Sequence, residues 1–162
     1  MPPVNERDVE WTETAEGSSH FRRKHLSRAA NGDWDPGLGC SLYELPPGAK
    51  SWPYHYHAGN AEAMYVLSGV GTLRLDGEEH SIEAGDYVPF PRGPAGAHTV
   101  HGGDEEPLRF LVFSEMVQPE VTVYPDSDKF GVYSGSPPGG REERPIHGYY
   151  RIDDDVDYWE GE

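Results

Sequence analysis

Glycine and proline interrupt this chain so often that only short secondary-structure elements fit between them. The 162 residues include 20 Gly and 15 Pro, and both residues disfavour the interior of a helix. The runs between these breaks are short and apolar or alternating, which is typical of β-strands. They lie at residues 38–45, 63–67, 71–75, 79–82, 87–90, 98–101, 108–116 and 120–124. Evenly spaced short strands predict an all-β fold, either a closed barrel or a double sheet.

The predicted strands leave a polar segment at each end of the chain. We therefore expect an N-terminal arm, a barrel and a C-terminal region, at residues 1–35, 36–124 and 125–162. The first 17 residues are expected to be loosely ordered, and a Gly/Pro-rich linker is expected over residues 125–148. The last residues form an acidic tail that contains Tyr149, Tyr150, Tyr158 and Trp159. So many aromatic rings favour docking of the tail onto the body or onto a partner.

The charge balance excludes some classes of partner. Lys and Arg number 13 and Asp and Glu number 29, which gives a net charge of −16. Nucleic acids and anionic membranes are bound by clustered positive charge, so we expect neither as a partner. No apolar run approaches the roughly 18 residues of a membrane span, and we expect a cytoplasmic protein. Cys40 is the single cysteine, which excludes an internal disulfide and a cysteine-based zinc cage.

The acidic composition also bears on the cellular environment. A high net charge keeps a chain soluble but causes self-repulsion, which salt screens. The composition is therefore typical of a halophilic protein from a salt-rich cytoplasm. An ordinary acidic cytosolic protein is the alternative.

The residues that carry chemistry are concentrated between positions 48 and 101. His55 and His57 are two residues apart, so on a strand both side chains face the same side, about 7 Å apart. A turn at residues 58–60 can return the chain so that Glu62 lies beside this pair, and His98 follows a second Gly-rich turn. A lone histidine on a strand is more often a surface or core residue than a ligand. Three imidazoles and a carboxylate together, however, suit a divalent metal ion.

The glycines and prolines around these residues form two blocks that resemble the two sequence motifs of the cupin superfamily. The first block contains Gly48, His55, His57, Glu62 and Gly69, and the second contains Gly85, Pro91, Gly93 and His98. Each block departs from the motif: one extra residue precedes His55, two extra residues precede His98, and Gly102 occupies the place of the motif's Asn. The chain also resembles a group of small single-domain cupins of unassigned function.

This resemblance implies a fold, a ligand set and an assembly. The fold would be a double-stranded β-helix, also called a jelly-roll barrel, with a metal near its wider mouth. The ligand positions carry over one by one to His55, His57, Glu62 and His98. The cofactor would be one divalent transition metal per chain, such as Zn, Fe, Mn or Ni, and the assembly would be a homodimer.

Two functions are compatible with such a site. In the first, the metal assists a reaction on a small oxygen-bearing molecule, as in the dioxygenases, isomerases or lyases of this family. In the second, the protein is a non-enzymatic cupin that binds or senses a sugar-like or acid-like small molecule. No separate general base is evident in the sequence, so whether the chain is an enzyme stays open.

Overall fold

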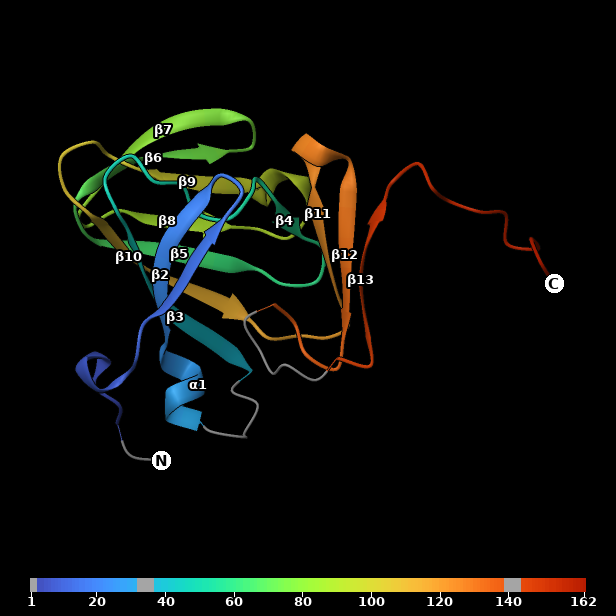
Figure 1. The fold of residues 1–162 in the computed structure, drawn as a ribbon, viewed down its shortest axis with the longest axis horizontal. Coiled ribbons are helices and arrows are strands. Elements are labelled where there is room, and N and C mark those ends of the chain that lie inside the picture. The colour runs from blue at the N-terminus through green and yellow to red at the C-terminus, as the bar shows by residue number, and fades with distance from the viewer. Residues whose placement is uncertain (1–2, 32–36, 139–143) are drawn as a thin grey trace.

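The protein is built almost entirely from antiparallel β-strands (Figure 1). The structure, a computed structural model, describes residues 3–31, 37–138 and 144–162. The helices in these ranges are short: α1 covers Leu26–Asn31, and the 3-10 helices η1, η2 and η3 cover Glu6–Asp8, Pro94–Gly96 and Pro125–Ser127. None of the described helices has the length and apolar character needed to cross a membrane.

The strands form three hydrogen-bonded sheets. The first sheet has the order β1 (Thr12–Glu16), β2 (Ser19–His25), β3 (Leu38–Leu45), β10 (Leu108–Glu115), β5 (Glu62–Ser68) and β8 (Tyr87–Phe90). The second has the order β13 (Ile146–Arg151), β12 (Lys129–Ser134), β11 (Glu120–Tyr124) and β4 (Tyr56–His57). The third has the order β7 (Glu78–Glu83), β6 (Val70–Leu75) and β9 (His98–Gly102).

The second and third sheets meet at a short seam. An isolated bridge pairs His55, just before β4, with His98 at the start of β9. The backbone amide of His55 donates to the carbonyl of His98 at 3.2 Å, and the reverse bond is 2.8 Å long. The third sheet and the six-stranded sheet contribute to one apolar core, in which Leu73 and Val100 lie with Met64 and Phe110. This arrangement is a jelly-roll β-barrel, as predicted.

Alternation along β5 shows how the sequence directs side chains into the barrel. Met64 and Val66 are fully buried, whereas Tyr65 and Leu67 are exposed. Since successive strand residues point to opposite faces, Glu62 lies on the same inward face as Met64. The start of β5 therefore delivers a carboxylate to the barrel interior, above a layer of apolar side chains.

The eight predicted strands are confirmed as β3 and β5 to β11, with ends that differ by at most one or two residues. The predicted hairpin between β6 and β7 is also present. Asp76 and Gly77 both have positive φ, at 48° and 84°, as a two-residue hairpin turn of this type requires.

Strands also form where the sequence indicated an arm and a linker. The strand β2 pairs with β3, and its Phe21 is 1% exposed and belongs to the core. Similarly, β12 pairs with β11 and carries the buried Tyr133. The prediction of an arm and a linker was wrong for these two strands. Charged residues concealed the strand pattern of β2, and the Gly and Pro residues close to β12 concealed that of β12. Residues 139–143 of the predicted linker lie outside the described residues.

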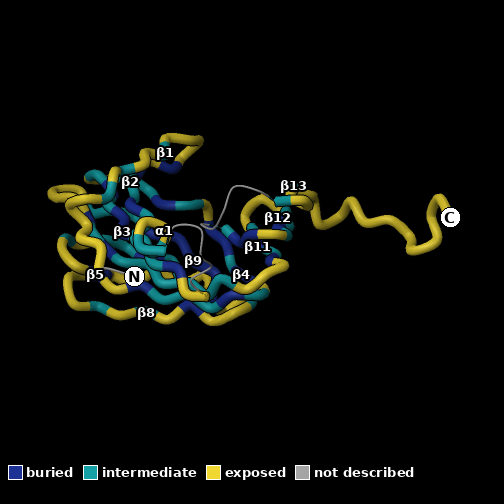
Figure 2. The backbone as a smooth tube through the Cα atoms, turned by 90° about the horizontal axis from the view of Figure 1, so that it is seen from below, coloured by how far each residue is buried: buried dark blue, intermediate teal, exposed yellow. Residues whose placement is uncertain are grey.

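The C-terminal tail extends away from the barrel after β13 (Figures 1 and 2). Residues 151–162 are exposed throughout, including the rings of Tyr158 and Trp159. Docking of the tail onto the body is therefore not what this structure shows. Docking onto a partner, and the homodimer implied by the family resemblance, stay predictions.

Candidate metal centre

Two stretches of the chain, residues 55–62 and the start of β9, bring the predicted ligands together inside the barrel. His57 is the last residue of β4, Glu62 is the first of β5 and His98 is the first of β9. His55 precedes β4 and is fixed beside His98 by the backbone bridge that joins the two sheets. The site therefore lies inside the barrel, between the bridge that joins the second and third sheets and the inward face of the six-stranded sheet.

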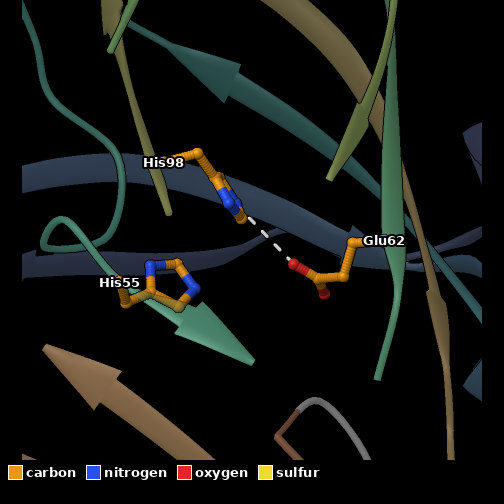
Figure 3. A group of neighbouring side chains, drawn as sticks. All are labelled: His55, Glu62 and His98. Atoms are coloured by element: carbon orange, nitrogen blue, oxygen red, sulfur yellow. Dashed lines mark ion pairs between the residues drawn. The ribbon is translucent and has the colours of Figure 1, made fainter. Parts of the chain in front are cut away.

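The side chains of His55, Glu62 and His98 point toward each other (Figure 3). His55, Glu62 and His98 each offer one ligand atom, and these atoms lie within 4.8 Å of one another. Glu62 Oε2 is 3.7 Å from His98 Nε2 and 3.3 Å from His57 Nε2. The carboxylate thus lies among the imidazoles. His55, Glu62 and His98 form the compact group, and His57 adjoins it through its contact with Glu62.

The outer nitrogens of two imidazoles are held by backbone carbonyls. His55 Nδ1 donates to the Pro53 carbonyl oxygen at 2.7 Å, and His98 Nδ1 donates to the Gly96 carbonyl oxygen at 2.9 Å. A proton held on Nδ1 leaves Nε2 with a free lone pair. Histidines that bind metals are oriented in this way by a hydrogen bond at the other nitrogen. The donor set therefore fits a divalent transition metal.

Glu120 and Thr122 contact His57 at Nδ1, the ring nitrogen that faces away from Glu62. Its Nδ1 lies 3.5 Å from Glu120 Oε1 and 3.3 Å from Thr122 Oγ1. Glu120 is fully buried, and it accepts hydrogen bonds from the Gly59 amide and from the Asn60 side-chain amide. A carboxylate behind a histidine fixes its ring and makes it a stronger ligand.

Sequence reasoning missed Glu120, although alternation along β11 groups it with other polar residues. Alternation along this strand places Glu120, Thr122 and Tyr124 on one face and two valines on the other. Glu120 and Thr122 are almost completely buried, so the polar face is the inward one. A strand whose buried face is polar indicates a functional cavity, because burial of such groups without partners is unfavourable.

Burial and charge set the protonation of the site in the metal-free chain. Burial, together with the nearby imidazoles of His98 and His57, lowers the pKa of His55 to about 3. Burial also lowers the pKa of His98. For His57, burial acts in the same direction, but the carboxylates of Glu62 and Glu120 outweigh it and raise the pKa to about 10. Burial raises the pKa of Glu62, but the imidazoles outweigh it and lower the value to about 2.

Replacement of Glu120 by glutamine is expected to weaken metal binding by roughly 10- to 100-fold, the usual cost of losing an orienting partner. The Gln amide would place an N–H group among the donors of Gly59 and Asn60, so the ring of His57 would lose its fixed position. Metal competition with a chromogenic chelator measures this change. Glu78→Gln, the same substitution on the exposed edge strand β7, is the control and should bind metal as the wild type does. Equal affinities for both variants would contradict the role of Glu120.

The four residues open into a cavity of about 450 Å³. Aromatic side chains form much of its wall, among them Tyr43, Trp52, Phe90, Tyr124 and Tyr133. The ring of Phe90 stacks on His98 with 3.7 Å between ring centroids. Such a cavity has the size and the mixed lining of a small-molecule site. His101 comes three residues after His98, so strand alternation turns it to the opposite face, and it is not among the described residues that line this cavity.

One known protein is related to this chain in sequence over about half its length. A protein of Methanocaldococcus jannaschii, named only as uncharacterized, is 32% identical over 80 residues, which cover 48% of this chain. The chain spans 62% of the length of that relative, somewhat less than two thirds.

Two crystal structures are similar over nearly the whole chain. One is a candidate sugar phosphate isomerase from Acidithiobacillus ferrooxidans, which is 28% identical with a TM-score of 0.75 over 93% of this chain and 88% of that one. The other is a sugar phosphate isomerase of the cupin superfamily from Silicibacter pomeroyi, which is 24% identical with a TM-score of 0.76 over 98% of both chains. The second likeness is one of fold. The family model of the cupin domain matches residues 41–114, and the chain therefore contains a cupin domain.

Proposed function

We propose that the chain binds one divalent transition metal through His55, His57, Glu62 and His98 and uses it to bind a small oxygen-bearing molecule. One observation carries this proposal. His55, Glu62 and His98 offer ligand atoms within 4.8 Å of one another, His57 Nε2 lies 3.3 Å from Glu62 Oε2, and each of the three imidazoles is oriented by a contact at Nδ1. A chance cluster of histidines in a core would not have all its outer nitrogens held.

The bound metal would supply Lewis-acid polarisation of a carbonyl or hydroxyl oxygen. The chain would supply the orientation of the molecule. Tyr124 stacks near His55 with ring centroids 5.9 Å apart, and burial raises the pKa of its phenol to about 12. The phenol therefore keeps its proton at neutral pH, so Tyr124 can donate a hydrogen bond to an oxygen of the molecule.

The substrate class that we propose is a small phosphorylated sugar, and the reaction is an isomerisation. The support is the likeness to the Acidithiobacillus ferrooxidans protein, named as a candidate sugar phosphate isomerase. Isomerisation of a sugar moves a proton between adjacent carbons, and polarisation of the carbonyl makes the neighbouring C–H group more acidic. This chemistry requires no external oxidant or reductant, because the oxidation of one carbon is balanced by the reduction of its neighbour. The volume of the cavity suits a small sugar.

A non-enzymatic binding protein is the second candidate. Apart from the four ligands, the described titratable groups that line the cavity are tyrosines, cations, Cys40 and Glu16. Glu16 is exposed, and the pKa of Tyr124 and that of Tyr133 are both raised by burial. None of these groups has the properties of a strong general base near neutral pH, which favours binding without turnover.

Elemental analysis of the purified protein tests the metal site. We expect about one transition metal per chain in the wild type and much less in His57→Ala, because that variant loses one ligand and leaves Glu120 without its imidazole. His80→Ala, on the exposed face of β7, is the matched control and should retain the metal. A metal-free wild type, or a His57→Ala protein with full metal content, would overturn the proposal.

A panel of sugar phosphates then separates the two candidate functions. The metal-loaded protein is expected to interconvert at least one aldose and ketose phosphate, followed by NMR, and to lose this activity after chelation. A metal-loaded protein that binds members of the panel in calorimetry but leaves all of them unchanged would favour the binding protein instead.

A further inference from the structure

The cavity contains an arginine whose position has no structural explanation within the fold. Alternation along β2 places Ser19, Phe21 and Arg23 on one face, and this face points into the barrel. Phe21 belongs to the core, while Ser19 and Arg23 line the cavity. An inward-facing charge on a sheet strand costs free energy unless a partner compensates it.

The contacts of Arg23 position its guanidinium group but do not neutralise it. Its Nη1 donates to Tyr43 Oη at 3.4 Å, and its Cζ lies 5.0 Å from the ring centroid of Trp52. Trp52 Nε1 in turn donates to Tyr43 Oη at 3.1 Å, which fixes both aromatic rings. The group is thus held in place by two neutral aromatic residues.

Part of the hydrogen-bonding capacity of Arg23 is unused. Its Nε atom is shielded from solvent and has no hydrogen-bond partner, and none of the described acidic residues forms an ion pair with Arg23. The neighbouring Arg22, on the other face of β2, is paired with Glu44 at 2.7 Å. The contrast shows that an arginine here can find a carboxylate and that Arg23 has none.

The charge of the cavity wall is opposite to that of the chain as a whole. Across the sequence, acidic residues outnumber basic ones by 29 to 13. Among the described residues that line the cavity, Arg23, Lys129 and Arg144 are basic, and only Glu16 and Glu62 are acidic. Since Glu62 belongs to the metal centre, the remaining wall is positively charged. A cavity lined by one sign of charge attracts ligands of the other sign.

We propose that Arg23 binds an anionic oxygen group, a phosphate or a carboxylate, on the molecule that occupies the cavity. This inference rests on the proposed function, since the same molecule would reach the metal centre with another oxygen. The planar guanidinium group offers parallel N–H donors that match two oxygens of such an anion. Arg23 is then a specificity-determining residue that selects charged over neutral molecules.

Calorimetric titration with inorganic phosphate tests this proposal on the purified protein, both as isolated and after chelation of metal. Arg23→Gln is expected to weaken phosphate binding at least tenfold in both states. Its metal content and melting temperature should remain close to those of the wild type. Arg22→Gln removes the same charge from the opposite face of β2 and should leave phosphate binding unchanged. Titration with acetate in parallel shows whether the group prefers a phosphate or a carboxylate.

The outcomes separate this inference from the proposed function. Phosphate binding that is absent from the wild type, or unchanged in Arg23→Gln, would overturn the role of Arg23 even if the metal is present. A wild type that holds no metal but binds phosphate through Arg23 would refute the metal site and leave the anion site intact. Arg23→Lys provides a second variant should Arg23→Gln fail to fold. It keeps the charge without the planar fork, so we expect weaker phosphate binding than in the wild type.

Discussion

Binding of Mn²⁺ at pH 8 is expected to release close to one proton per chain, because the metal-free site holds a proton on His57. The carboxylates of Glu62 and Glu120 overcome the effect of burial and raise the pKa of His57 to about 10. A metal ligand must be deprotonated, so the ion displaces this proton. Below the raised pKa the apparent affinity should therefore fall about tenfold for each unit of decrease in pH.

Calorimetry in two buffers with different heats of ionisation counts the protons released. Three histidines with ordinary pKa values near 6.5 would together carry only about 0.1 proton at pH 8, so the two cases differ clearly. Mn²⁺ is chosen because its bound water keeps its protons better than water on Zn²⁺. His80→Ala should release the same number of protons as the wild type. A release near zero at pH 8 would show that Glu62 and Glu120 do not hold His57 in its charged form.

Gly96→Ala is expected to disrupt both the barrel and the metal centre. A Cβ atom at this position would lie 1.8 Å from the carbonyl oxygen of Pro91, so the backbone of η2 must move. The carbonyl of Gly96 holds His98 Nδ1, and Gly93 of the same turn donates its amide to the carbonyl of His57. We expect a loss of about 1–3 kcal/mol in the free energy of unfolding, as for other overpacked sites.

The effect on metal binding should accompany this loss of stability. A displaced His98 is expected to lower metal affinity roughly tenfold or more, by the same reasoning as for other orienting contacts. Thermal melting and metal competition measure the two effects on one protein sample. Ala95→Ser, at the exposed neighbouring position of the same turn, is the control. A Gly96→Ala protein that melts and binds metal like the wild type would show that the turn can relax without moving His98.

The grouping of His55, Glu62 and His98 was predictable from sequence because these residues follow local rules. His55 and His57 are two positions apart, with Tyr56 between them, and strand periodicity alone places them on one face. Gly-rich turns near Glu62 and His98 allow the chain to return to the same place. These features are local, so they can be read without knowledge of which strands are neighbours.

Glu120 and Arg23 could not be assigned in this way. Glu120 contacts His57 from 63 positions further along the chain, and Arg23 meets Trp52 across 29 positions. The sequence does not specify which strand lies beside which, so a single acid or base on a strand gives no sign of its partner. In addition, Arg23 lies in a basic run at residues 22–24, which is more typical of a solvated surface than of a barrel interior.

The bridge between His55 and His98 has a mechanical consequence. Two proposed metal ligands are also the residues whose backbone hydrogen bonds join the second and third sheets, while Glu62 projects from the six-stranded sheet. An ion held by these side chains would cross-link all three sheets of the barrel at a single point. Loss of the ion would then soften the mouth of the barrel as well as remove its chemistry, so that metal supply would control the rigidity of the entrance and the access of solvent to the interior.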